Sequence, residues 1–408
     1  MSIAIPAEDP RHLPNRAVVD LGAITHNTRQ IAGSLAEQTA LMAVVKADAY
    51  GHGMLGAARA ALAGGATWLG AAHPASALAL SRAGIDVPIF TWLYDPRTAR
   101  ELLPAMISAS IEISVGSRRM LELVSEAARE SDLRARVHLK IDTGMGRGGA
   151  LPEHVLELGV RTREDENLNL VATWTHLSSA DALGEDTTDR QIDIFDSICE
   201  DLTEEVGPIA LQHVANTAAT LSRRDLHRDL VRTGIGLYGY APVPTDLDLR
   251  PAMSLTSRIA MVKEVGAGQS VGYGRIHTAA TATRLGLIPV GYADGLDRAA
   301  SGAVSVLVRT RAGDQFAPQV GRISMDQIVV DLGPDSAARE EDEVIIFGAP
   351  DALDAPAAGA PEITGPRLDP PTAEDWARAA GTIPYEILTS LSVRVPREVR
   401  SPAAGDAA

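Results

Sequence analysis

Cysteine is almost absent from this 408-residue chain, which contains only Cys199. A single cysteine excludes an intrachain disulfide and any metal site built from several thiolates. Because Cys199 lies within a helical pattern of apolar residues, we interpret it as a buried core thiol rather than a nucleophile. The 10 histidines also lack the His-Glu-x-x-His spacing of zinc peptidases, and we therefore predict no metal.

Positive charge and long apolar runs are also scarce. The 37 Lys and Arg residues against 53 Asp and Glu residues give a formal net charge of −16, which opposes attraction to nucleic acids. No apolar run is long enough to span a bilayer, and Met1–Arg16 lacks a basic start followed by an apolar stretch. We therefore expect a cytoplasmic protein that has neither nucleic acid nor membrane as a partner.

The first part of the chain alternates short β-rich runs with longer helical patterns, which is typical of βα units around a parallel sheet. Helical segments are predicted at Leu55–Ala63, Ala75–Arg82, Ser117–Glu130 and Thr188–Leu202. Eight strands are predicted, at Leu41–Lys46, Trp68–Ala71, Val87–Trp92, Ile111–Ser114, Val137–Asp142, Val171–His176, Gln212–Asn216 and Val231–Gly234. Eight is the number of strands that closes a (β/α)8 barrel.

After about Pro251 the strands follow one another without intervening helices, which indicates an antiparallel β domain. We expect a surface loop at Gly348–Pro371 and a short helix at Thr372–Ala380. The β-rich runs are Ser257–Val265, Arg284–Val290, Ser305–Arg309, Gln327–Asp331 and Glu343–Phe347. The predicted chain is thus α/β, with a TIM-like barrel over residues 13–250 and a mainly antiparallel domain over 251–400. The strand at 16–20 is a candidate to join the second domain.

Polar side chains stand at the carboxyl ends of the predicted barrel strands, where barrel enzymes carry their reacting groups. These residues are Lys46, Lys140, Asp142, His176, Asn216 and Arg232. A locally cationic barrel mouth on an acidic protein indicates a small anionic ligand, such as a phosphate with a carboxylate. The glycines of Arg232-Thr-Gly-Ile-Gly would let backbone N–H groups approach a phosphate closely.

Lys46 is the most informative of these residues. An arbitrary lysine after a buried strand is usually a surface residue. A lysine that points into a barrel mouth can instead form a Schiff base with a carbonyl cofactor, provided its amine is unprotonated. Its reference pKa of about 10.4 must then be lowered by burial or by cationic neighbours, for which Lys140 and Arg232 are candidates.

Nine segments resemble the motifs of the alanine racemase family, in the family's order and across nearly the whole chain. They are Val45-Lys-Ala-Asp-Ala-Tyr-Gly-His-Gly, Lys140-Ile-Asp-Thr-Gly-Met-Gly-Arg, Trp174-Thr-His, Ala215-Asn-Thr-Ala, Arg232-Thr-Gly-Ile, Val271-Gly-Tyr-Gly, Gly291-Tyr-Ala-Asp-Gly, Ser324-Met-Asp-Gln and Ile383-Pro-Tyr-Glu. The resemblance implies a pyridoxal-phosphate enzyme of fold type III that interconverts L- and D-alanine by two bases. It also implies a homodimer with shared active sites and a supply of D-alanine for peptidoglycan, although a catabolic role stays open.

The resemblance also implies the catalytic roles. Lys46 would hold the cofactor and act on D-alanine, while Tyr273 from the neighbouring subunit would act on L-alanine. Arg232 would contact the pyridine nitrogen and, because arginine stays charged, keep that nitrogen unprotonated, which favours racemisation over transamination. His176 would link Tyr273 to Arg232. Each residue also has a structural alternative: Tyr273 could be an exposed loop tyrosine, His176 a core histidine, and Arg232 a partner in a surface ion pair.

Further residues match binding positions of the family. The cofactor set consists of Lys46, Tyr50, Asn216, Thr217, Arg232, Gly234, Ile235 and Tyr385, with Thr217 where the family usually has serine. Arg147, Met325 and Tyr273 correspond to the substrate site, and Lys140 to a lysine that is carbamylated in some relatives. An entry corridor would be lined by Tyr292, Arg298, Arg322, Ile383 and Asp181. Tyr50 and Tyr385 could equally be packing aromatics, and Lys140 a salt-bridge partner of Asp142.

Several other functions stay open from the sequence. A racemase of serine or another small amino acid is the nearest alternative, because an apolar pocket discriminates poorly against one hydroxyl. A decarboxylase of the same fold type would need room for a distal amine. A non-catalytic pyridoxal-phosphate protein would lack the second domain, and an inactive paralogue would have substitutions at essential positions.

Overall fold

The computed structural model describes residues 12–349 and 365–400. They form two compact units, and each is described by itself. The α/β unit contains residues 24–49 and 53–249, and the β unit contains the described parts of 1–23, 50–52 and 250–408. In the described part of the chain, no helix is long and apolar enough to cross a membrane.

Eight parallel strands form one sheet in the α/β unit, in the order β8-β7-β6-β5-β4-β3-β2-β9. Its end strands meet through backbone bonds from Arg232 N to Ala215 O (3.0 Å) and from Asp229 N to Gln212 O (3.3 Å). The sheet is therefore a nearly closed barrel, which confirms the predicted fold class. The strands are β2 (Ala40–Val44), β3 (Trp68–Ala71), β4 (Ile89–Thr91), β5 (Glu112–Val115), β6 (Ala135–Lys140), β7 (Leu168–Trp174), β8 (Leu211–His213) and β9 (Leu230–Thr233).

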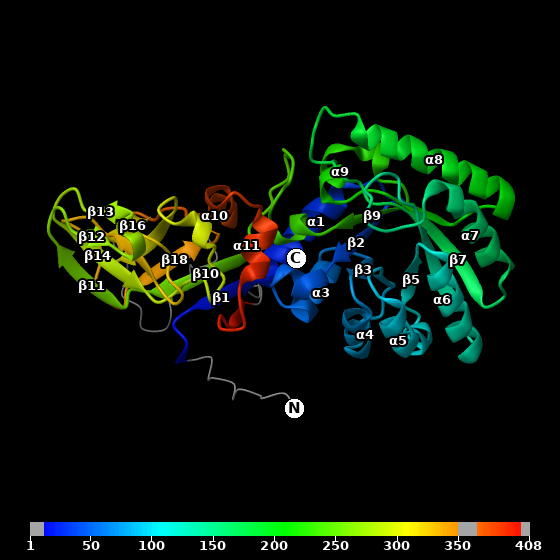
Figure 1. Ribbon diagram of the computed structural model, residues 1–408, viewed down its shortest axis with the longest axis horizontal. Coiled ribbons are helices and arrows are strands. Elements are labelled where there is room, and N and C mark those ends of the chain that lie inside the picture. Colours follow the sequence, from blue (N-terminus) through cyan, green and yellow to red (C-terminus); the bar gives the residue numbers. More distant parts are fainter. Residues whose placement is uncertain (1–11, 350–364, 401–408) are drawn as a thin grey trace. The chain divides into compact units, whose positions relative to one another are not determined.

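Helices surround these strands, as Figure 1 shows for α3 to α8. Their sequence dictates which face is buried: in α6, Leu121, Val124 and Ala128 recur at intervals of three or four residues and are buried. Local signals set their ends, since the side chain of Asp95 caps α5 just before Pro96. The helices are α1 (Leu21–Ser34), α3 (Met54–Ala63), α4 (Pro74–Arg82), α5 (Pro96–Ser108), α6 (Arg118–Glu130), α7 (Pro152–Glu164), α8 (Thr187–Val206) and α9 (Thr217–Ser222), and the segment α2 (Lys46–Tyr50) is a left-handed turn.

Six of the eight barrel strands end one to three residues earlier than predicted, and several predicted site residues therefore move from a strand into the segment that follows. Strands β2, β7 and β8 stop at Val44, Trp174 and His213, so Lys46, His176 and Asn216 lie in the loops that follow. The cause is visible at β2, where the backbone N–H of Val45 still bonds to Gly70 O (2.8 Å) before the chain turns away at Lys46. The polar residues are thus carried by loops that the strands hold in place.

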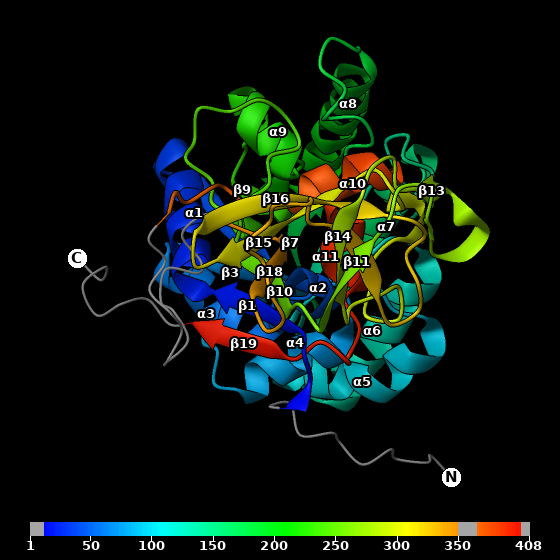
Figure 2. The ribbon, with the colours of Figure 1, turned by 90° about the vertical axis from the view of Figure 1, so that its left-hand side faces the viewer.

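The β unit contains a nine-stranded sheet in the order β11-β14-β17-β16-β15-β18-β10-β1-β19. Figure 2 shows β15, β18, β10, β1 and β19 side by side. Only β1 and β19 pair in parallel, so the sheet is mainly antiparallel, as predicted. The strands are β1 (Arg16–Asp20), β10 (Met253–Arg258), β11 (Met261–Val265), β14 (Thr283–Ile288), β15 (Ser305–Thr310), β16 (Gly313–Val320), β17 (Ile328–Asp331), β18 (Glu343–Phe347) and β19 (Arg397–Arg400). The small ribbon β12 (Ser270–Val271) and β13 (His277–Thr278) stands apart.

Sequence patterning erred at several places in this unit, and the short strands β12, β13 and β19 were not predicted. The single strand predicted at Ser257–Val265 is two strands, because Ile259 N bonds to Asp342 O and Ala260 N bonds to Leu287 O, on different neighbours. Strand β16 was not predicted, since its polar residues and Pro318 hide the alternation.

The helix predicted near residue 372 is α10 (Ala373–Ala380), which begins with a capping box between Thr372 and Asp375. Most of the loop predicted at Gly348–Pro371 lies outside the described residues.

Candidate active site

Lys46 opens a left-handed turn that follows strand β2. The φ angles of Ala47, Asp48, Ala49 and Tyr50 lie between 51° and 56°. A left-handed conformation costs a non-glycine residue about 1–2 kcal/mol, so it persists only where surrounding bonds enforce it. Two such bonds run from Ala49 N to Val45 O (3.0 Å) and from Met54 N to Asp48 Oδ1 (2.8 Å). The turn takes the backbone out of the strand direction directly after Lys46.

The Lys46 amine has the electrostatic setting that a nucleophilic or basic lysine needs. Burial, and then the positive charge of Arg147, lower its pKa from the ordinary value. A lowered pKa increases the unprotonated fraction near neutral pH, and only the unprotonated amine carries a reactive lone pair.

His176 shows that the cationic residues gather at one place. Burial lowers the pKa of His176 to about 2, assisted by the charges of Arg232, Arg147, Lys46 and Lys140. Cationic residues on separate loops and strands of the barrel therefore act on one imidazole. At neutral pH this imidazole is uncharged.

Lys140 ends strand β6 within the same group. Burial, followed by Arg147 and Arg232, lowers the pKa of Lys140 to about 8, while Asp142 acts in the opposite direction. The Asp142 carboxylate also accepts hydrogen bonds from Gly144 N and Gly146 N, both at 3.1 Å, which fix the loop that carries Arg147. The group has a surplus of cations and suits an anionic ligand.

Arg232 lies buried on strand β9, and its terminal nitrogens are fully engaged. Nη1 donates to His213 Nδ1 (3.0 Å) and His213 O (2.8 Å). Nη2 donates to Thr175 O (2.8 Å) and Val214 O (3.2 Å). Of the five N–H donors of Arg232, only the Nε–H has no hydrogen-bond acceptor among the described residues. An exposed ion pair, the alternative considered for Arg232, does not describe this environment.

The segments after β8 and β9 meet through Thr217 and Gly234. The Gly234 N–H donates to Thr217 Oγ1 (2.9 Å), and the Asn216 side chain caps α9 by accepting from Ala219 N (3.1 Å). Ile235 begins the short helix η3 (Ile235–Tyr238) directly after Gly234. Hydroxyl, amide and backbone N–H groups of the predicted phosphate set are therefore neighbours.

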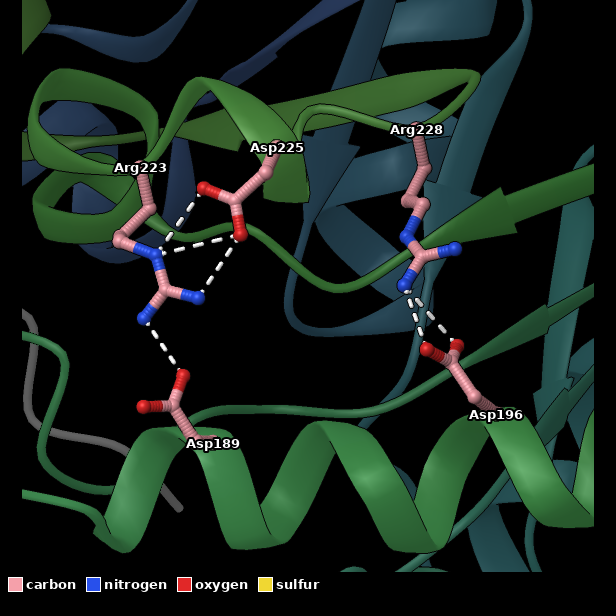
Figure 3. Close-up of polar contacts among 5 residues, drawn as sticks. All are labelled: Asp189, Asp196, Arg223, Asp225 and Arg228. Carbon is pink, nitrogen blue, oxygen red and sulfur yellow. Dashed lines mark hydrogen bonds and ion pairs between the residues drawn. The ribbon is translucent and has the colours of Figure 1, made fainter.

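Ion pairs tie the segment between α9 and β9 to helix α8 (Figure 3). Arg223, just after α9, bonds to Asp225 (2.8 Å) and to Asp189 on α8 (2.7 Å). Arg228, just before β9, bonds to Asp196 on α8 at 2.8 Å. Each pair is partly exposed and contributes about 0–1 kcal/mol, but together they limit where α9 can move.

The remaining predicted residues lie in the β unit or on the surface. Tyr273 starts the turn η4 (Tyr273–Arg275), between the positive-φ residues Gly272 and Gly274, and its side chain is 71% exposed. Met325 is 53% exposed. Its carbonyl accepts from Ala293 N (2.9 Å), next to Tyr292. The corridor residues Tyr292, Arg298, Arg322 and Ile383 are exposed in the β unit, and Asp181 is exposed in the α/β unit.

Two aromatic residues of the predicted cofactor set meet within the β unit. The rings of Tyr50 and Tyr385 lie 5.9 Å apart, and Tyr385 belongs to helix α11 (Pro384–Ser390). Burial and the proximity of Tyr385 raise the pKa of Tyr50, so its hydroxyl stays a hydrogen-bond donor.

Sequence reasoning missed two residues that hold this site. Gln191 on α8 donates to Thr143 Oγ1 (3.0 Å) and His176 O (3.3 Å), which fixes the loop carrying His176. His213 contacts Arg232 directly. A polar residue inside an otherwise apolar barrel strand or helix face was the available signal for both.

The sequence matches two protein-family models, one after the other along the chain. Residues 19–242 match the alanine racemase N-terminal domain, and residues 252–399 match the alanine racemase C-terminal domain. The chain belongs to the alanine racemase family.

Individual alanine racemases agree with this assignment. The alanine racemase of Beutenbergia cavernae is 42% identical over 394 residues, which cover 94% of this chain and 97% of the relative. That of Salinispora tropica is 44% identical over 387 residues, covering 93% and 96%. The solved structure of the Streptomyces coelicolor enzyme has a TM-score of 0.85 at 42% identity and covers 95% of this chain and 98% of its own.

Alanine racemases are isomerases that depend on pyridoxal phosphate, and the α/β unit has the chemistry to hold this cofactor. Pyridoxal phosphate presents an aldehyde, a phosphate and a pyridine nitrogen that accepts a hydrogen bond. The Lys46 amine, the Thr217–Gly234 segment and the Nε–H of Arg232 match these three groups in turn. Within the described residues, no cluster of His, Cys, Asp and Glu could hold a metal ion.

Proposed function

We propose that this protein interconverts L-alanine and D-alanine with pyridoxal phosphate as its cofactor. The observation that carries the proposal is the group formed by Lys46, Lys140, Arg147, His176 and Arg232, in which the pKa of Lys46 is lowered. Membership of the alanine racemase family indicates which reaction to expect. This group of residues offers the amine and the positive charges that such a reaction needs.

The energetics explain why side chains need a cofactor here. A positioned base accelerates proton transfer about 10²–10⁴-fold, whereas enzymes typically lower barriers by about 8–23 kcal/mol. Pyridoxal phosphate, when bound, supplies a conjugated ring that delocalises the electron pair left when the α-proton of alanine departs. The protein must then hold the reactants and move protons.

Two bases on opposite faces of the substrate would move the proton. We propose that Lys46 exchanges the α-proton of D-alanine at Nζ and that Tyr273 of a second copy exchanges the α-proton of L-alanine at its phenol oxygen. His176, neutral at ordinary pH, accepts a hydrogen bond more readily than an imidazolium would and suits a link to that phenol.

Arg232 tunes the reaction through a fixed charge. Its guanidinium remains protonated, so the Nε–H would donate to the pyridine nitrogen of a bound cofactor and keep that nitrogen unprotonated. By holding the pyridine neutral, Arg232 would make the bound cofactor a weaker electron acceptor than a pyridinium, which would favour racemisation over transamination.

Cofactor and substrate anions have separate binding groups. Thr217, Asn216, Gly234 and Ile235 are proposed to bind the phosphate, and resemblance alone adds Tyr50 and Tyr385. The substrate carboxylate would pair with Arg147 and with the backbone N–H of Met325 from a second copy. A carbamate on Lys140 would supply the negative charge that positions Arg147.

The exposed side chains of the β unit support a homodimer. Tyr273, Tyr292, Met325 and Ile383 are each at least 41% exposed, an unusual setting for large apolar groups that match functional positions. We propose that these residues face a second copy, where the corridor residues Tyr292, Arg298, Arg322, Ile383 and Asp181 restrict entry to a small side chain.

Reductive trapping tests the proposal. The purified protein is incubated with pyridoxal phosphate, treated with borohydride and mapped by mass spectrometry. Because the chain has only three lysines, Lys46, Lys140 and Lys263, assignment is simple, and the label is expected on Lys46. Optical rotation should show L-alanine racemised well ahead of L-serine. A label on another lysine, or no change in L-alanine rotation, would contradict the proposal.

A further inference from the structure

Three buried polar residues inside the barrel have no role in the reaction described so far. Glu112 begins strand β5, His138 lies on β6 and His213 ends β8, and their exposed fractions are 1%, 0% and 0%. Barrel interiors are normally filled by branched apolar side chains. Burying a carboxylate among them is costly unless hydrogen bonds compensate for the lost water.

Side-chain hydrogen bonds join these residues to Arg232 in one continuous hydrogen-bond chain. Arg232 Nη1 is 3.0 Å from His213 Nδ1, and His213 Nε2 is 2.9 Å from His138 Nδ1. His138 Nε2 in turn contacts Glu112 Oε2. The chain therefore connects the cofactor-facing arginine with a carboxylate at the amino end of a barrel strand.

The charges of Arg232 and Glu112, at the two ends of this hydrogen-bond chain, determine which nitrogen of each imidazole carries the proton. Arginine can only donate, so His213 Nδ1 must accept and its proton sits on Nε2. That N–H donates to His138 Nδ1, and the His138 proton on Nε2 donates to the Glu112 carboxylate. Both imidazoles are thus neutral, and burial lowers the pKa of both.

Glu112 is the carboxylate at the far end of this chain. The four acceptors bonded to Arg232 are uncharged, being three backbone carbonyls and one imidazole. Although burial opposes ionisation of Glu112, hydrogen bonds from His138 and Arg136 together lower its pKa. Arg136 Nε binds Glu112 Oε1 at 2.7 Å from a half-exposed side chain.

Aromatic packing prevents the rings from turning. Phe90 stacks on His138 at 4.6 Å between ring centroids, and Trp174 stacks on His213 at 5.5 Å with planes 6° apart. With both imidazole planes fixed, Arg232 cannot rotate its terminal nitrogens without breaking the chain.

We propose that Glu112, His138 and His213 are positioning residues that act through Arg232. They engage the Nη1 edge of the guanidinium and hold its orientation, so that the Nε–H is the donor left for the pyridine nitrogen. This inference rests on the proposed function, in which Arg232 contacts the cofactor.

The first experiment needs no substitution. Nitrogen-15 NMR of histidine-labelled holoenzyme should show two neutral rings protonated on Nε2 that do not titrate between about pH 6 and 9, the range around the ordinary histidine pKa. Rings that titrate there, or that carry the proton on Nδ1, would overturn the inference.

The second experiment removes the charge but keeps the shape. Glu112→Gln retains an oxygen to accept from His138 and should lower kcat about tenfold, or about 1.4 kcal/mol, at nearly constant KM. Pyruvate released per racemisation turnover should rise about fivefold. A guanidinium that is held less firmly would let the pyridine nitrogen gain a proton more often, and a pyridinium promotes transamination. Merely structural residues would not change this product ratio.

A matched control and the wild type separate the two proposals. Glu157→Gln removes one carboxylate from the exposed face of α7 and should leave both kcat and the pyruvate ratio unchanged. If Glu112→Gln behaves like Glu157→Gln in an active enzyme, the positioning role is wrong while the racemase function stands. A wild type that binds no cofactor would refute the racemase function itself.

Discussion

The carboxylate of Asp48 accepts a hydrogen bond from the backbone N–H of Met54 at 2.8 Å, and this bond closes the left-handed turn that begins at Lys46. The turn places four consecutive non-glycine residues at positive φ. The protein thus keeps strained backbone next to its proposed cofactor lysine, where a precise side-chain position matters most.

Substitutions at the exposed Ala47 should reveal this strain. Ala47→Val places a β-branched residue at positive φ and should cost about 1–2 kcal/mol of unfolding free energy. Ala47→Gly relieves the strain but adds unfolded-state entropy, and should be neutral or stabilising by up to about 1 kcal/mol. Urea unfolding measures both.

Ala105 provides the control for that pair. It is an exposed residue in the right-handed helix α5, where Ala105→Gly should cost about 1 kcal/mol. If Gly destabilises position 47 as much as position 105, the left-handed turn is not strained in solution.

His176 should make stability sensitive to acid. Its folded pKa, about 2, lies below the unfolded value of 6.5, so the unfolded chain binds more protons between these pH values. The contribution of this histidine is therefore complete above pH 6.5 and is lost progressively as the pH falls, by up to about 2 kcal/mol at pH 5.

Comparison of wild type with His176→Gln isolates that contribution, because His213 stays in both proteins. Urea midpoints at about pH 7 and pH 5 should fall less for His176→Gln than for the wild type. Parallel losses in the two proteins would show that His176 is not held neutral.

Lys140 should react with carbon dioxide. Because its pKa is lowered to about 8, much of the amine is unprotonated in mildly alkaline solution and can add to the carbon of CO₂, releasing one proton. Carbon-13 NMR in labelled bicarbonate should show one carbamate resonance. The resonance should vanish in Lys140→Ala and persist in Lys263→Ala, whose lysine is exposed on β11; the reverse would exclude Lys140.

Tyr273→Phe should separate the two directions of the reaction. The substitution removes only a hydroxyl from an exposed ring, so folding and cofactor absorbance should not change. Exchange of the α-proton with solvent deuterium should slow by at least about 10²-fold for L-alanine, the scale of a positioned base, and far less for D-alanine. Equal slowing for both enantiomers would argue against the assignment.

The sequence alone determined the fold class, the family resemblance and the cationic group at the barrel mouth. Strand periodicity and eight βα alternations predict a barrel whatever the detailed packing. The carboxyl ends of parallel strands meet at one edge, so Lys46, Lys140, His176 and Arg232 could be grouped from their order in the chain. Local patterning failed where pairing is non-local, as at Ile259 and Ala260, and where polar residues hide the alternation of a strand, as in β16.

Only the tertiary structure decided how Arg232 is held. Glu112, His138 and His213 lie on three different strands, and their spacing in the sequence carries no sign that they touch. The direction of their hydrogen bonds depends on which side chains face each other across the closed barrel. Likewise, the left-handed turn after Lys46 contradicts the intrinsic preference of alanine and exists because Asp48 and Val45 supply bonds that local propensity does not encode.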